Sequence, residues 1–150
     1  MSTTFSVMGA KVSYTKIPCT YGAGEEWACS EAERCGYCDN GMEDVRTSDA
    51  PEANFSNVNA GRLLLALGVM GDPSYGEVKA GDIPAFRRAI VRALNKDMSP
   101  LATPFSHTKR PGKDEVFQME VTEESFQRRF EAVDAICKVA QEREVGIHWS

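Results

Sequence analysis

The strongest structural signal in this chain lies at residues 122–142, which read TEESFQRRFEAVDAICKVAQE. Apolar side chains recur there every three or four residues and share one narrow stripe of a helix: Phe126, Phe130, Val133, Cys137 and Ala140. Thr122 is a typical N-cap residue, so the helix is expected to span about 123–142. Opposite charges four positions apart favour the same helix: Glu124 with Arg128, and Asp134 with Lys138. The stripe also predicts that Cys137 is a buried core thiol.

Two shorter helices are predicted ahead of this one. Ser56 or Asn57 can cap the first, whose apolar residues keep a helical spacing up to Gly68, a typical C-terminal glycine: Ala60, Leu63, Leu64 and Leu67. The second begins near Asp82 and Pro84 and has one apolar side: Ile83, Phe86, Ile90 and Leu94. Its opposite side is basic and carries four cations: Arg87, Arg88, Arg92 and Lys96.

Strands are predicted mainly in the N-terminal third. Residues 10–18 are rich in β-branched side chains up to Pro18, and Met42 to Thr47 is expected to return beside them as a hairpin. Residues 48–57 and 97–115 contain prolines and polar turn residues, so both are expected to be loops. Further short strands are expected where apolar residues alternate with polar ones: Phe117, Met119 and Val121, then Ile147 and Trp149.

These elements predict an α+β fold in which a small N-terminal hairpin and a Cys-rich loop, residues 19–38, pack on about three helices. A chain of 150 residues fits a single domain, residues 1–150. The longest mostly apolar stretch, Leu63 to Met70, has eight residues, far fewer than the roughly 20 that a membrane span needs. We therefore expect no membrane contact.

The cysteines are unevenly distributed, with four of the five inside the Cys-rich loop: Cys19, Cys29, Cys35 and Cys38. The N-terminal residues lack the basic segment and apolar core of a secretory signal, so a cytosolic location is expected. In that compartment such clustering favours metal binding or redox chemistry over structural disulfides, and reduced cysteines without a metal stay open as the alternative. A redox site is disfavoured because Asp39-Asn40-Gly41 after Cys38 is a turn sequence, whereas redox Cys-x-x-Cys pairs open a helix.

The stretch Cys35-Gly36-Tyr37-Cys38-Asp39-Asn40-Gly41 resembles the knuckle of a zinc ribbon, or one half-site of the cysteine-rich module of DnaJ-type chaperones. The resemblance covers seven residues and implies a zinc ion held by thiolates. A ribbon has a second Cys-x-x-Cys; here Cys19 and Cys29 would complete the set. If Cys29 points away, three residues can substitute for it: His107, His148 or Asp39. Four cysteine ligands leave no open position, so the zinc is expected to be structural.

The sequence indicates less about the function of the protein than about its fold. The sequence has no Gly-x-Ser-x-Gly elbow, Walker loop or dinucleotide-binding glycine motif. Because a site closed by four cysteines leaves no position for a substrate, a binding or adaptor domain is favoured over an enzyme. Another protein is the expected partner, contacted through Trp27 in the acidic Cys-rich loop or through Arg88 and Arg92. Two alternatives stay open: a metal-dependent enzyme with Glu25 or Glu26 as base, and a nucleic-acid binder using Arg88, Arg92 and Lys109. The net charge of −5 disfavours nucleic acid.

Overall fold

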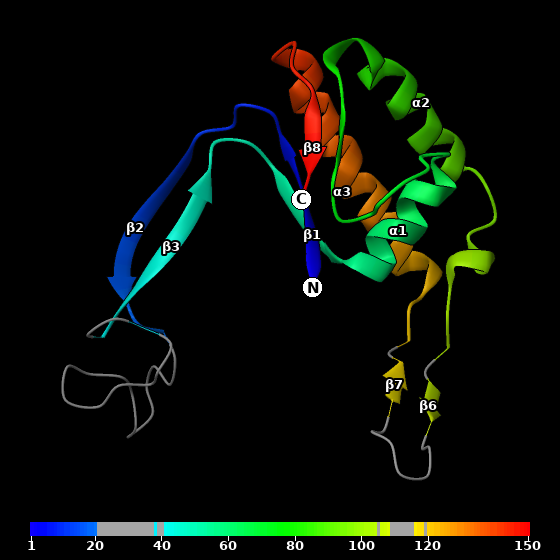
Figure 1. The fold of residues 1–150 in the computed structure, drawn as a ribbon, viewed down its shortest axis with the longest axis horizontal. Coiled ribbons are helices and arrows are strands. Elements are labelled where there is room, and N and C mark those ends of the chain that lie inside the picture. Colours follow the sequence, from blue (N-terminus) through cyan, green and yellow to red (C-terminus); the bar gives the residue numbers. More distant parts are fainter. Residues whose placement is uncertain (21–37, 39–40, 105, 109–115, 119) are drawn as a thin grey trace. The chain divides into compact units, whose positions relative to one another are not determined.

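The structure is a computed structural model that describes residues 1–20, 38, 41–104, 106–108, 116–118 and 120–150. The chain divides into two units, here called the body, Met1–Gly9 with Ala50–Ser150, and the arm, Ala10–Asp49. The described part contains three α-helices and antiparallel strands, which confirms the α+β class; Figure 1 labels these elements along the chain. The expectation of a single domain stays a prediction.

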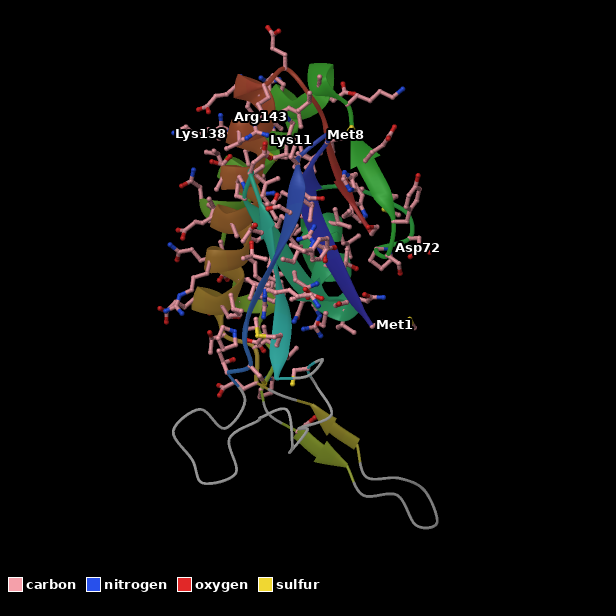
Figure 2. All side chains as sticks on the ribbon, turned by 90° about the vertical axis from the view of Figure 1, so that its left-hand side faces the viewer. Met1, Met8, Lys11, Asp72, Lys138 and Arg143 are labelled. Atoms are coloured by element: carbon pink, nitrogen blue, oxygen red, sulfur yellow. The ribbon has the colours of Figure 1, made fainter. Side chains whose placement is uncertain are left out.

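The body contains a four-stranded antiparallel sheet with the strand order β4-β1-β8-β5. Its strands are β1 (Ser2–Val7), β4 (Glu52–Ser56), β5 (Gly76–Val78) and β8 (Ile147–Trp149). Met1 and Met8 mark the two ends of β1 (Figure 2). Because β1 pairs with β4 on one side and with β8 on the other, a strand from each end of the sequence lies at the centre of the sheet.

The two faces of this sheet differ in chemistry, because side chains alternate along each strand. One face contributes the largest apolar side chains of the strands to the core: Phe5, Val7, Ile147 and Trp149. The three helices lie on one side of the strands (Figure 1). The opposite face is polar: Ser2, Thr4, Ser6, Glu52, Asn54, Glu77 and His148.

The helices are α1 (Asn57–Ala66), α2 (Ile83–Leu94) and α3 (Glu123–Glu142). The predicted N-cap residues of α1 and α3 are confirmed. The Ser56 hydroxyl accepts a hydrogen bond from the Asn59 backbone N–H at 3.4 Å, and Thr122 accepts one from Ser125 at 3.1 Å. Gly68 follows α1 with a φ of +79°, the left-handed conformation that glycine adopts most easily.

The apolar stripe of α3 forms the centre of the core. All five predicted residues are fully buried, and Ile136 joins them: Phe126, Phe130, Val133, Ile136, Cys137 and Ala140. The apolar side of α2 is buried through Ile83, Phe86 and Ile90. Helical periodicity therefore identified the core side of both helices.

Two loop predictions were wrong in part. Residues 48–57 contain β4, and all five residues of β4 pair with β1, so long-range hydrogen bonding prevails over weak local strand propensity. Within 97–115 the structure has a 3₁₀ turn at Ser99–Leu101 and the strand β6 (Ser106–Thr108), which pairs with β7 (Val116–Gln118). Strand β1 was not expected from the sequence.

The arm contains the predicted hairpin. Strand β2 (Val12–Pro18) pairs in antiparallel register with β3 (Met42–Ser48), from Val12 opposite Ser48 to Pro18 opposite Met42. A hydrogen bond of 2.7 Å between the hydroxyls of Ser13 and Thr47 joins the two strands on one face. Most of the Cys-rich loop lies outside the described residues, so its expected packing on the helices stays a prediction.

Candidate functional site

Cys19 lies at the end of the β-ladder of the arm, directly after β2. The Cys19 backbone N–H donates to the Gly41 carbonyl oxygen at 2.8 Å, so Cys19 lies opposite a residue three positions after Cys38. Gly41 has a φ of +79°, in keeping with the predicted turn at this point. Cys19 and Cys38 are both half-buried.

The other proposed ligands, Cys29 and Cys35, lie outside the described residues, and so does Trp27. In the part of the chain that is described, no group of three or more His, Cys, Asp or Glu side chains is arranged to hold a metal ion. His148, named above as a substitute ligand, lies 3.1 Å through its Nε2 from the hydroxyl of Ser6.

The basic side of α2 is divided into two kinds of arginine. Arg87 reaches across to α3, where Nε donates to Asp134 Oδ1 at 2.8 Å and a second nitrogen donates to Oδ2 at 3.2 Å. Its third donor meets Gln141 Oε1 at 3.0 Å. The hydrogen bond to Asp134 raises the pKa of Arg87. Arg87 is thus a bidentate link between helices, and Asp134 pairs with it in place of the expected Lys138.

Arg88 and Arg92, by contrast, are exposed. They border a groove of about 540 Å³ together with four neighbours: Pro84, Arg87, Val91 and Gln141. The surface of the groove is mostly apolar, and Val91 is 51% exposed at this place. Within the described residues, neither Arg88 nor Arg92 forms an ion pair. We call this feature the α2 groove.

A second hollow, of about 510 Å³, lies between β5 and α2 and also includes Arg92. Its charged lining is mixed, with Glu77 and Asp82 facing Lys79 and Arg92. Since these charges offset one another, this hollow offers less preference for a ligand of either sign than the α2 groove does.

Sequence reasoning missed the polar links across the sheet. Ser6 and His148 face each other in register, and their hydrogen bond ties β1 to β8. Asn54 donates to the hydroxyls of Thr4 at 2.7 Å and Ser2 at 3.3 Å. These partners are far apart in the sequence, and only the strand register brings them together.

Cys137 is confirmed as a core thiol. It is fully buried, and this burial raises its pKa from 9.0 to about 12. We expect the thiol of the folded protein at pH 8 to resist Ellman's reagent and to react on denaturation. Because folding favours the protonated thiol, its contribution to stability is complete below pH 9 and declines as the pH rises toward 12. Rapid labelling of Cys137 in the folded protein, identified by mass spectrometry, would contradict this assignment.

No protein-family model, no curated protein and no solved structure matches this chain. None of the helices in the described part combines the length and apolar composition that crossing a bilayer requires. The function must therefore be argued from the arm and the α2 groove.

Proposed function

We propose that this protein is a small cytosolic binding or adaptor domain whose arm is stabilised by a structural zinc ion and contacts another protein. The observation that carries the proposal is that the described part of the arm contributes no side chain to a hydrophobic core. None of its described residues is buried, and two of its apolar side chains are strongly exposed, Tyr14 at 67% and Val12 at 40%.

A unit of this kind needs an additional source of stability. The arm has 40 residues, Ala10–Asp49, and an isolated two-stranded hairpin is marginally stable in water. Chains of roughly that size usually depend on a metal, disulfides or a partner to fold. Four of the five cysteines of the chain belong to this unit, which is where such a cross-link is needed.

The proposed ligands suit zinc. Thiolates bind Zn²⁺ tetrahedrally, and the resemblance to a zinc-ribbon knuckle supplies Cys35 and Cys38 as a pair. The backbone bond from Cys19 to Gly41 supports a third ligand beside that pair, and Cys29 would be the fourth. A site closed by four cysteines favours a structural role over a catalytic one, and reduced thiolates agree with a cytosolic location.

The test is the zinc content of the purified protein, measured by plasma mass spectrometry beside two cysteine variants. We expect about one zinc per chain in the natural protein and in Cys137→Ala, and close to none in Cys38→Ser. Cys38→Ser should also make the arm far more sensitive to limited proteolysis, because metal binding and folding of such a unit are coupled.

The Cys137→Ala control distinguishes an effect on the body from an effect on the arm. Cys137→Ala removes a thiol from the core of the body, so it should lower the melting temperature while the zinc content stays unchanged. Natural protein that holds no zinc, or a Cys38→Ser variant that keeps both its zinc and its protease resistance, would refute the metal site.

A further inference from the structure

The α2 groove has the layout of a binding surface with an apolar floor and a positive rim. Pro84, Arg88 and Val91 stand at helical spacings of four and three, so they share one face of α2. Arg92 lies one turn beyond Arg88 on the same side. Arginine side chains can pack along apolar surface through their methylene groups and keep the charged head in water, and both Arg88 and Arg92 line the groove.

One wall of the groove is held in place by the link between the helices. Arg87 is fixed by Asp134 and Gln141, and two of these three residues, Arg87 and Gln141, line the groove. A surface whose side chains are already ordered loses less conformational entropy on binding. The Arg87 and Gln141 side chains of the groove are therefore ordered before a ligand arrives.

We infer that the α2 groove binds an acidic amphipathic helix of a partner protein. The inference rests on the protein-binding role proposed above and adds the chemical class of the partner. Apolar side chains of such a helix would cover Val91 and Pro84, and its carboxylates would pair with Arg88 and Arg92. Charge complementarity carries the choice, because both guanidinium groups at the rim are without an ion-pair partner among the described residues.

A nucleic acid fits this surface less well. Phosphate binding depends on the number of cations, and the Asp134 carboxylate neutralises Arg87, the third arginine at the groove. The exposed side chain of Val91, which also lines the groove, has no group that could bind a phosphate. The net charge of −5 adds a general repulsion.

The experiment measures binding of a fluorescent synthetic peptide of about 15 residues, with leucine at every third or fourth position and glutamate between. We expect saturable binding to the natural protein by fluorescence anisotropy. Arg88→Glu with Arg92→Glu should weaken it about tenfold or more, and Val91→Ser should also weaken it. Thermal melting of each variant verifies that it is folded.

The control is Lys138→Glu, which reverses one positive charge at an exposed position of α3 (Figure 2) and is matched to each arginine reversal made singly; it should leave the affinity unchanged. A scrambled peptide of the same composition tests the helical spacing, and a duplex oligonucleotide tests the alternative. The inference is overturned if the natural protein does not bind the peptide, if the arginine variant binds equally well, or if only the duplex binds.

Failure of this inference and failure of the zinc proposal can be told apart. The groove belongs to the body, and the cysteines belong to the arm. A preparation without zinc that binds the peptide refutes the metal site alone. A preparation with one zinc per chain that ignores the peptide refutes the groove alone.

Discussion

Trp149→Ala is expected to lower the free energy of unfolding by about 3–5 kcal/mol, the usual cost of removing a large buried aromatic side chain. Trp149 is 3% exposed and stacks on Phe5, with ring centroids 5.5 Å apart and an angle of 26° between the rings. Phe5 also contacts Phe55 with ring centroids 5.6 Å apart. The indole therefore joins the last strand to the centre of the core.

Urea denaturation at equilibrium measures this loss, with Ser150→Ala as the control because Ser150 is exposed. Trp149→Phe should cost less than Trp149→Ala. It keeps an aromatic ring beside Phe5, whereas the alanine variant leaves a larger cavity there. Equal stability of Trp149→Ala and Ser150→Ala would show that the indole is not part of the core.

Gly76→Ala is expected to destabilise the body by about 1–3 kcal/mol through overpacking. A Cβ atom at Gly76 would overlap the indole of Trp149, its opposite residue in the neighbouring strand. Gly146→Ala should be at least as costly, because its Cβ would meet the backbone oxygen of Val78, which cannot move without disturbing β5.

Gly81→Ala is the matched control, since no atom lies within 4 Å of the position of its Cβ. Its effect should stay within about 0.5 kcal/mol. A double-mutant cycle sharpens the test. In a Trp149→Ala background, Gly76→Ala should lose most of its cost, because the overlapping ring is gone. If Gly76→Ala destabilises the Trp149→Ala protein equally, the destabilisation comes from the backbone and not from overlap with the indole.

The helices were predictable because each carries its own local signals. Thr122 and the apolar stripe after it defined α3, and Ser56 with Gly68 bounded α1. Strand β4 was missed for the opposite reason. Pro51 and Asn54 are typical of loops, and the strand exists because β1 lies beside it. An alternation of Thr3, Phe5 and Val7 was present in β1 and could have indicated a half-buried strand.

The candidate sites also depend on contacts between residues that are far apart in the sequence, which local patterns do not reveal. Spacing alone grouped Arg87 with Arg88 and Arg92 on a basic face, and it paired Asp134 with Lys138 on α3. In the structure Arg87 is not available for a ligand, because it is hydrogen-bonded to Asp134. The two residues are 47 positions apart in the sequence, so spacing could not indicate this pair. Only the packing of α2 on α3 reveals which two arginines are available at the groove.

The strand order of the body has a consequence for protein synthesis. β8 follows every other element in the sequence, yet it lies between β1 and β5. Until β8 leaves the ribosome, one edge of β1 has no neighbour and β5 has no place in the sheet. Until β8 has been made, the nascent chain therefore exposes an unpaired strand edge, the kind of surface on which misfolded chains associate and to which chaperones bind.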